Sequence, residues 1–406
     1  MTSELTWLDD GGVTSPLGWQ AGAVDSGVKS YGPQPRRDLA ILASDRPAAV
    51  AGVFTRNRIV GPAVRLSRER VAGGVAQALV VNSGNANTVT GEQGERDALR
   101  MAALIAQRFG LSEQHVLIGS TGVIGRALPM QRIERGIAAV ALSRTGGGEF
   151  ARAIMTTDTV PKQHAVRFTA GGRAYIVGGT AKGSGMIHPD MATCFCFLTT
   201  DAPADATWLR AALRRVADAS INMVDVDMDT STSDTMLLFA NGAGGGDPIV
   251  DGHPAAQPLL TALEAVAVAL ARALARDGEG ATALIEVVVE GAATLDDARR
   301  AARTISASPL VKTMITGHDP NWGRVLMAIG RSGARVEERT TSVWIGEHCT
   351  LERGVPSTID LALVSAAMDR EEVRIRVDLG QGAQRATAWG CNMTAEYVHI
   401  NAHYTT

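Results

Sequence analysis

The stretch GGTAKGSGMIHPDMATCFCFLTTD, residues 178–201, passes from closely spaced glycines into an apolar run. Glycine tolerates backbone conformations that other residues avoid, whereas Pro189 fixes its own φ angle. The run CFCFLTT (194–200) is short, apolar and followed by a turn, which predicts a buried strand. One hydroxyl side chain, Thr193, stands at the junction. The stretch therefore predicts a core strand that begins directly after a threonine.

The composition is that of a protein with a large core. The chain has 406 residues, 45% of them hydrophobic and 20% charged, with a net charge of −3 and a pI near 6.3. This length predicts two or three domains, or one large domain with an additional lobe. Positive charge forms no long block, so the sequence does not indicate a nucleic-acid or membrane-surface partner.

Strand-like and helix-like segments alternate along the chain. Short apolar runs predict strands at 48–55, 76–82, 194–200, 235–240 and 284–291. Helical periodicity predicts helices at 93–109, 130–142, 206–219 and 295–303, and one whose apolar face carries Leu263, Val266, Ala267, Leu270 and Leu274 and which ends near Gly278. The glycine fingerprint of a dinucleotide-binding fold is missing from the sequence. The pattern predicts an α/β or layered α+β fold.

The remaining segments do not favour a metal, a disulfide or a membrane span. Four cysteines, with no Cys-x-x-Cys pair, are expected to be reduced core thiols. DVDMDTSTSD (225–234) lacks the glycine and glutamate of a calcium loop, so we interpret it as a turn that orders a neighbouring site. The acidic N-terminus has no apolar signal region, and the apolar segment around 258–280 is interrupted by Glu264 and Arg272. We therefore expect a cytoplasmic protein without a metal.

Two further motifs have a structural and a functional interpretation. EYVHINAHY (396–404) alternates like a strand, which would place His399 and His403 roughly 13 Å apart, too far for one metal ion. DPNWGR (319–324) predicts a tight turn whose Arg324 either binds a carboxylate or braces the turn. We favour the structural interpretation for both motifs.

Thr193 could act as a nucleophile in acyl transfer. A threonine hydroxyl needs a nearby base, and a free α-amino group on the same residue can supply it, with a pKa of about 7.7–8.0. Gaining that amine requires the Thr193 hydroxyl to attack the Ala192 carbonyl, followed by hydrolysis of the resulting ester. The alternative is an ordinary strand threonine, because the dipeptide Ala-Thr also begins at 206, 281, 293 and 386.

The loop GSTGVIG (119–125) is a candidate partner for this chemistry. It lacks the Gly-Lys-Ser/Thr ending of a nucleotide-binding loop. Its glycines could instead direct backbone N–H groups at an anion or oxyanion.

Seven motifs carry a family resemblance over essentially the whole chain. They follow the order seen in ornithine acetyltransferases, the glutamate N-acetyltransferases of the arginine acetyl cycle, which the chain closely resembles. The motifs are STGVIGR (120–126), IMTTDT (154–159), AKGSGMIHPDMAT (181–193), DGEGAT (277–282), SPLVKT (308–313), DPNWGR (319–324) and INAHYTT (400–406).

The resemblance implies a fold and a maturation step. The fold would be similar to N-terminal-nucleophile hydrolases, with a larger lobe of about 1–280, a smaller C-terminal lobe of about 281–390 and a tail of 391–406 that returns to the active site. Cleavage between Ala192 and Thr193 would give an α fragment, 1–192, and a β fragment, 193–406. Two of each would assemble into an α2β2 heterotetramer.

The resemblance also implies the reaction. Acetyl would move from N2-acetyl-L-ornithine to Thr193, ornithine would leave, and L-glutamate would collect the acetyl in a ping-pong cycle. Thr193 would be the nucleophile and, through its amine, the base, while Thr121 and Gly122 would form the oxyanion hole. The implied substrate-binding residues are Thr156, Thr157, Lys182, Glu279, Asn401 and Thr406. No cofactor is implied, although acetyl-CoA is a possible co-substrate.

The sequence departs from the family pattern near the implied site, and other functions stay open. Ser233 stands where Asn is familiar, Ala283 where Lys is common, and Asn392 where Asp is familiar; Cys194 and His188 also differ from the common residues. These changes touch neither the nucleophile nor the oxyanion pair. The alternatives are a specialised-metabolite paralogue with another donor or acceptor, an amidohydrolase or aminopeptidase on the same scaffold, and a non-catalytic relative.

Overall fold

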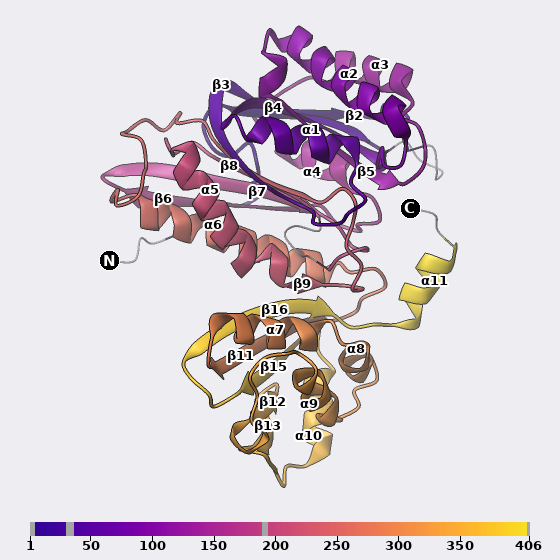
Figure 1. Cartoon of the computed structure of the whole chain (residues 1–406), viewed down its shortest axis with the longest axis vertical. Coiled ribbons are helices and arrows are strands. Elements are labelled where there is room, and N and C mark those ends of the chain that lie inside the picture. The colour runs from indigo at the N-terminus through magenta and orange to yellow at the C-terminus, as the bar shows by residue number, and fades with distance from the viewer. Residues whose placement is uncertain (1–4, 30–35, 189–193, 404–406) are drawn as a thin grey trace.

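The computed structural model describes residues 5–29, 36–188 and 194–403, and within these ranges the chain forms two β-sheets with helices packed against them (Figure 1). The larger sheet has the order β1-β6-β7-β8-β10-β3-β4-β5, and β2 pairs with β3 outside this path. Its strands are β1 (Thr6–Trp7), β2 (Trp19–Val24), β3 (Leu39–Phe54), β4 (Val75–Asn85), β5 (Val116–Val123), β6 (Lys162–Ala170), β7 (Arg173–Lys182), β8 (Phe195–Thr200) and β10 (Thr235–Ala240).

The predicted core strand is confirmed as β8. It runs antiparallel to β7 and parallel to β10. Because successive strand residues point to opposite faces, Cys196 and Leu198 enter one hydrophobic cluster while Phe195 and Phe197 enter another. The alternating CFCFL run is therefore buried on both faces, which explains why it contains no charged residue.

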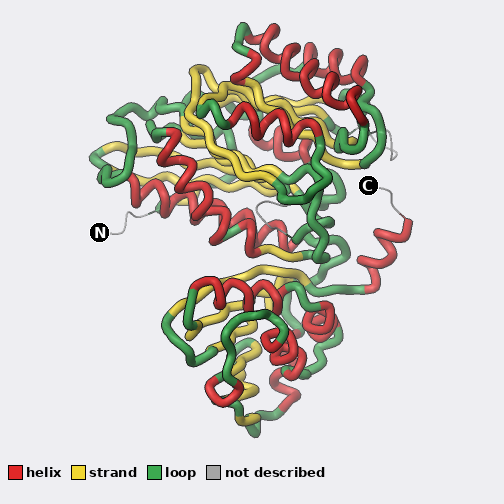
Figure 2. The backbone as a smooth tube through the Cα atoms, viewed as in Figure 1, coloured by secondary structure: helices red, strands yellow, loops and turns green. Residues whose placement is uncertain are grey.

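Helices cover the two outer faces of the larger sheet. On one side, α5 (Ala206–Ala219) and α6 (Ala256–Arg276) pack against β3, β6 and β7. On the other, α2 (Gly91–Phe109) and α3 (Met130–Ala139) build a cluster with β4 and β5. The helices α1 (Pro62–Val71) and α4 (Gly147–Ile154) contribute to a further hydrophobic cluster with β3, β4 and β8. Figure 2 shows helices, in red, on both sides of the strands, in yellow. The layered α/β class expected from the sequence is confirmed.

The smaller sheet has the order β14-β13-β12-β15-β11-β16-β9. Its strands are β9 (Val224–Asp225), β11 (Leu284–Ala292), β12 (Ser342–Ile345), β13 (His348–Glu352), β14 (Val355–Pro356), β15 (Glu372–Asp378) and β16 (Gln384–Cys391). The accompanying helices are α7 (Leu295–Ser306), α8 (Pro309–Thr316), α9 (Gly323–Gly330) and α10 (Leu361–Met368), and short 3-10 turns lie at Glu113–His115, Ile221–Met223 and Glu338–Thr340. One hydrophobic cluster is continuous from β8 and α6 into β11, β15 and β16.

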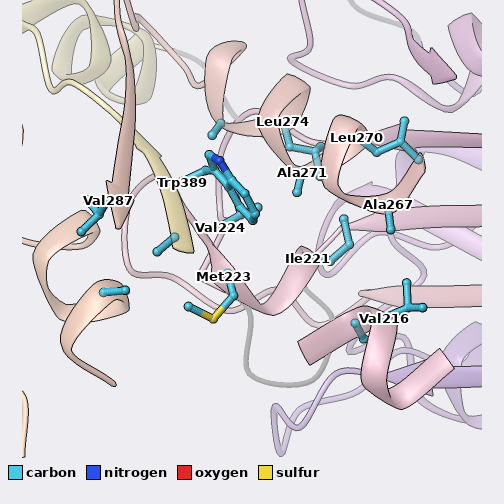
Figure 3. Packing of buried hydrophobic residues seen from close by; sticks show 14 of the residues in the cluster. Val216, Ile221, Met223, Val224, Ala267, Leu270, Ala271, Leu274, Val287 and Trp389 are labelled. Atoms are coloured by element: carbon cyan, nitrogen blue, oxygen red, sulfur yellow. The ribbon is translucent and has the colours of Figure 1, made fainter. Parts of the chain in front are cut away.

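The junction between the two sheets is packed by α6 and β16. Figure 3 shows Leu270, Ala271 and Leu274 on α6, and Trp389 and Val224 on the neighbouring strands β16 and β9. All five side chains belong to the same buried cluster. The helix α6 is long and apolar enough, with a mean hydropathy of 1.6, to meet a length-and-composition criterion for a membrane span. The buried face of α6 packs against both sheets and joins them.

The structure confirms most predicted elements and corrects one. The strands expected at 48–55 and 284–291 are parts of the longer β3 and β11, and the helix expected at 206–219 is α5. The strand expected at 396–404 is wrong, because Ala395–His403 forms the helix α11. Thr394 precedes this helix and its Oγ1 accepts a hydrogen bond from the Glu396 N–H at 3.2 Å, as an N-terminal capping side chain does.

DPNWGR forms the predicted turn, and Arg324 braces it. The Arg324 guanidinium donates to the Leu310 carbonyl at 3.0 Å and lies 3.5 Å from the Asp319 carboxylate. The structural interpretation of this motif is therefore supported.

Leu274→Ala tests whether the packing of α6 joins the two sheets. Leu274 is fully buried, and truncating a buried leucine removes apolar contacts and leaves a cavity, so we expect a loss of about 2–5 kcal/mol in the free energy of unfolding. Urea denaturation measures it. Leu363→Ala, on an exposed position of α10, is the matched control and should cost far less. Equal losses in the two variants would contradict the assignment of α6 as the joining element.

Candidate active site

A cavity of about 130 Å³ lies where the ends of several elements of the larger sheet meet the smaller sheet. We call it the active-site pocket. Its walls come from segments far apart in the sequence: the end of β5, the end of β7, the start of β8, the loop between β9 and β10, the turn after α6, and α11. Among the residues that line it are Thr121, Gly122, Thr156, Thr157, Lys182, Cys194, Asp227, Asp234, Glu279, Tyr397 and Asn401.

The end of β5 supplies the two expected oxyanion donors. Gly122 has a φ of +126°, a conformation that side chains rarely adopt, and a Cβ there would lie 2.4 Å from the carbonyl carbon of Gly84 on β4. Thr121 is buried, and its Oγ1 accepts from Lys182 Nζ at 3.4 Å. A hydroxyl that accepts from an ammonium keeps its own hydrogen available for donation. The loop can thus present a hydroxyl and an N–H at one side of the pocket.

Lys162 on β6 holds three site-bearing segments together. Its Nζ lies 2.6 Å from Asp158 Oδ1 and 2.6 Å from Asp277 Oδ2, and all three side chains are buried. Asp158 also accepts from the N–H groups of Thr156, at 2.9 Å, and Gly183, at 2.6 Å. Burial would raise the pKa of Asp158, but the ammonium groups of Lys162 and Lys182 outweigh it and hold the pKa at about 2.

Asp277 completes this arrangement after the end of α6. Its carboxylate accepts from the Thr159 N–H at 3.1 Å and from the Thr159 hydroxyl. Two residues further on, the Glu279 N–H donates to the Ser184 carbonyl at 2.8 Å. The segments 156–159, 182–184 and 277–279 are therefore fixed to one another by charge and by hydrogen bonds.

Glu279 and Asn401 meet at the far side of the pocket. Asn401 Nδ2 donates to Glu279 Oε2 at 2.9 Å, so α11 brings the C-terminal part of the described chain to the turn after α6. The Glu279 carboxylate lies against Gly185, where a Cβ would be 2.5 Å from its atoms. Thr157 Oγ1 is 2.7 Å from Ser184 Oγ on the same side. A carboxylate in this position can bind an ammonium group of a ligand.

The turn between β9 and β10 forms an acidic wall. Asp227 accepts from the N–H groups of Met186 and Ile187 at 2.6 and 2.9 Å, and from that of Asp229 at 3.2 Å. Burial raises the pKa of Asp227, although these donors oppose the shift. Burial and the charge of Asp227 also raise the pKa of Tyr397. The interpretation of DVDMDTSTSD as a turn that orders a neighbouring site is therefore supported.

Asp234 is the most deeply buried carboxyl of this wall. It precedes Thr235, whose N–H donates to the Cys194 carbonyl at 3.0 Å, and its Oδ2 has no hydrogen-bond partner among the described residues. Burial raises the pKa of Asp234 well above its usual range, and the Lys182 ammonium opposes this only in part. Burial therefore favours the protonated form of Asp234, which lies beside the start of β8.

The departures from the family pattern are accommodated by local contacts. His188 Nδ1 lies 2.9 Å from Asp225 Oδ1, whose other oxygen is 2.9 Å from the buried Lys312 ammonium. Asn392 Oδ1 accepts from the Ala283 N–H at 2.9 Å, so two of the departures adjoin each other. Burial raises the pKa of the Cys194 thiol, as expected for an unreactive core thiol.

The structure brings most predicted site residues together and corrects one expectation. Thr121, Gly122, Thr156, Thr157, Lys182, Glu279 and Asn401 all line the active-site pocket. Ala192, Thr193 and Thr406 lie outside the described residues. The predicted separation of His399 and His403 is wrong, because on α11 they are one turn apart and their ring centroids are 4.7 Å apart.

Sequence reasoning missed Asp158, Lys162, Asp234, Asp277 and Tyr397. One signal for part of this set was the scarcity of lysine, since the chain has four lysines among 39 Lys and Arg residues. Lys162, Lys182 and Lys312 are buried and Lys29 is half-buried, so no lysine is a freely exposed surface residue. Buried ammonium groups need partner oxygens, which makes each of these lysines a marker of a polar network.

Comparison with known proteins shows the family of this chain. The family model described as the ArgJ family matches residues 20–406. The chain belongs to the ArgJ family. It is therefore an enzyme of arginine biosynthesis, and the curated relatives that it matches are named arginine biosynthesis bifunctional proteins.

Similarity to these relatives extends over the full length. The protein of Symbiobacterium thermophilum is 49% identical over 99% of this chain and 100% of its own length. That of Dehalococcoides mccartyi is 44% identical over the full length of both chains. A crystal structure of the arginine biosynthesis bifunctional protein ArgJ from Bacillus halodurans is 40% identical, with a TM-score of 0.50, and covers 52% of this chain and 98% of that chain.

Lys162→Met tests the buried network. The substitution leaves two buried carboxylates without their cation, which we expect to lower the free energy of unfolding by about 3–5 kcal/mol. Urea denaturation measures the loss. Arg167→Met removes an exposed cation from the same strand and is the matched control. A loss no larger than that of the control would show that Lys162 does not hold these segments.

Asp234→Asn tests the neutral carboxyl. Because burial raises its pKa, the folded protein keeps a proton that the unfolded chain releases near pH 4, so wild-type stability should fall as pH rises above that value. The variant lacks this titration and should gain stability relative to wild type between about pH 4 and 7. Urea midpoints across this range check it, with the exposed Asp251→Asn as control. A difference in stability between the variant and wild type that does not change with pH would contradict the raised pKa of Asp234.

Proposed function

We propose that this ArgJ-family enzyme transfers the acetyl group of N2-acetyl-L-ornithine to L-glutamate through an acetyl ester on Thr193. One observation carries the proposal. Thr121, Gly122, Lys182, Glu279 and Asn401 converge on the pocket that Cys194, the residue after Thr193, also lines. These are the residues that the family resemblance assigns to the reaction, and they come from four separate segments.

Self-cleavage would prepare the nucleophile. The Thr193 hydroxyl attacks the Ala192 carbonyl carbon, the Ala192–Thr193 amide bond breaks, and the nitrogen takes the hydroxyl proton. Water then hydrolyses the ester, which leaves a carboxylate on Ala192 and a free amine and hydroxyl on Thr193. The amine can accept and return a proton near neutral pH.

Acetyl transfer would then proceed in two half-reactions. The Thr193 amine takes the hydroxyl proton while the oxygen attacks the acetyl carbonyl carbon. The Thr121 hydroxyl and the Gly122 N–H donate to the oxyanion, and ornithine leaves with the proton on its α-amine. The α-amine of glutamate next attacks the acetyl ester, the oxyanion is stabilised in the same way, and Thr193 recovers its proton. Fixed donors of this kind lower the barrier because they need no reorganisation during the reaction.

The charges of the pocket fit the donor. Lys182 is the cation beside the oxyanion pair and can bind the α-carboxylate of an amino acid. Glu279, held by Asn401, can bind the ammonium group at the end of an ornithine side chain. This pairing of one cation with one anion favours a transferase that holds a whole amino acid over a hydrolase on the same scaffold.

The setting of the enzyme follows from the same proposal. The two fragments would assemble as α2β2 in the cytoplasm, and no cofactor enters the steps above. Acetyl-CoA stays a possible second donor. A specialised-metabolite paralogue with another acceptor would differ in which amino acid discharges the acetyl enzyme.

Thr193→Ala tests the nucleophile. Denaturing mass spectrometry of the purified wild type should give two fragments that sum to the chain plus one water, with a break before Thr193. The variant has no hydroxyl to attack and should stay a single chain that transfers no acetyl group. Thr207→Ala, at the exposed start of α5, is the control and should be cleaved and active. A cleaved, active Thr193→Ala enzyme would end this mechanism.

A further inference from the structure

A second, wider cavity adjoins the active-site pocket. It has a volume of about 1040 Å³ and shares Thr156 and Thr157 with the active-site pocket, so these two residues form a common wall. Its lining includes the cations Lys29, Arg36, Arg37 and Arg152, with two imidazoles from α11. We call it the basic pocket.

The two pockets carry opposite charge. Apart from Asp234, whose pKa is raised by burial, the active-site pocket is lined by the carboxyl groups of Asp227, Asp229 and Glu279 against the single cation Lys182. The basic pocket has four Lys and Arg side chains against two carboxylates, Asp25 and Asp158, and Asp158 is already bound to Lys162. A ligand that reaches the common wall therefore meets an anionic side and a cationic side.

Lys29 is the cation of the basic pocket that lies closest to the oxyanion strands. Its aliphatic stem packs on Gly84, where an added Cβ would be 2.7 Å from Lys29 Cγ, and Gly84 pairs with Gly122 across β4 and β5. Its Nζ donates to the Arg37 carbonyl at 3.1 Å, and its N–H donates to Asp38 Oδ2 at 2.9 Å. Burial lowers the pKa of Lys29 to about 8, with Asp38 opposing the shift.

Two of the other three cations of this pocket already contact a carboxylate. Arg37 and Arg152 both contact the Glu149 carboxylate. Lys29 forms no ion pair with a carboxylate side chain among the described residues, and two of its three ammonium hydrogens are not engaged by the Arg37 carbonyl. A half-buried ammonium with open donors is suited to a carboxylate ligand.

The proposed reaction requires such a charge difference. Both substrates present an α-amino nitrogen and an α-carboxylate, but the donor side chain ends in an ammonium group and the acceptor side chain ends in a carboxylate. A single subsite that binds one of these ends well would repel the other, because like charges in a partly buried site cost free energy.

We propose that the basic pocket binds the side-chain carboxylate of the acetyl acceptor, with Lys29 as its counter-ion, while the donor ammonium binds on the Glu279 side. This inference rests on the proposed function. The side chains of the donor and the acceptor point in different directions from Thr156 and Thr157. The α-amino nitrogens of the two substrates occupy a common position, so that one nucleophile serves both. Lys29 is then the residue that selects a dicarboxylic acceptor.

Steady-state kinetics of the cleaved wild type and of Lys29→Met test this inference. We expect the KM for glutamate to rise about ten-fold or more, which corresponds to about 1.4 kcal/mol, because the variant loses a charged hydrogen bond. The KM for acetylornithine and the rate of ornithine release without an acceptor should change less than about two-fold, since the donor uses the other side. The preference for glutamate over glutamine as acceptor should be smaller in the variant than in wild type.

Controls separate this outcome from a general effect. Lys29→Arg keeps the charge and should retain most of the preference for glutamate over glutamine. Arg96→Gln removes a cation from an exposed position of α2 outside both pockets and should leave both KM values unchanged. Equal rises in both KM values, or no rise in either, would overturn the assignment of Lys29.

Failure of the proposed function has a different signature. If wild type released no ornithine from acetylornithine, acetyl transfer itself would be wrong. Calorimetric titration of the wild type with glutamate would still test the basic pocket. Weaker glutamate binding in Lys29→Met, with unchanged binding in Arg96→Gln, supports the pocket. Equal binding in wild type and Lys29→Met overturns it.

Discussion

The site depends on one buried ammonium group. Lys162 Nζ lies between the Asp158 and Asp277 carboxylates, 2.6 Å from each. Removing charges from water is costly, so this group is stable only because both carboxylates approach it at hydrogen-bonding distance. The loops that carry Thr157, Lys182 and Glu279 are consequently fixed relative to one another. Because the pKa of Asp158 is held at about 2, its part of this stabilisation is present above the ordinary Asp pKa and is lost only as pH falls towards 2.

The position of the pocket follows from the architecture. The end of β7 and the start of β8 adjoin in the larger sheet, and the end of β5 reaches the same pocket, so short loops with polar side chains meet there without disturbing the core. The turn after β9 and the helix α11, which follows β16, line the other side of this pocket. A rigid scaffold then holds Thr121, Gly122, Lys182 and Glu279 in fixed positions, as the proposed electrostatic catalysis requires.

The smaller sheet also holds the segment that leads to the proposed cleavage position. His188 contacts Asp225 at the end of β9, and Asp225 is bound to Lys312 of α8. The Thr230 hydroxyl donates to the His188 carbonyl at 2.9 Å. The chain before residue 189 is thereby attached to β9, α8 and β16, since Lys312 also donates to the Cys391 carbonyl at 3.0 Å. Such an attachment links the geometry of this segment to the folding of the smaller sheet.

The sequence by itself determined the core elements and the family. The alternating CFCFL run identified β8, the helical periodicity identified α5 and α6, and the ordered motifs identified the family, because each is a local pattern or a direct comparison. It failed at 396–404, where a short alternating pattern cannot distinguish a strand from a helix that buries none of its residues fully. Only the tertiary structure placed Lys162 between two carboxylates, brought Asn401 to Glu279 and set Lys29 beside Gly84. These contacts join residues 115, 122 and 55 positions apart, and no local pattern contains such distances.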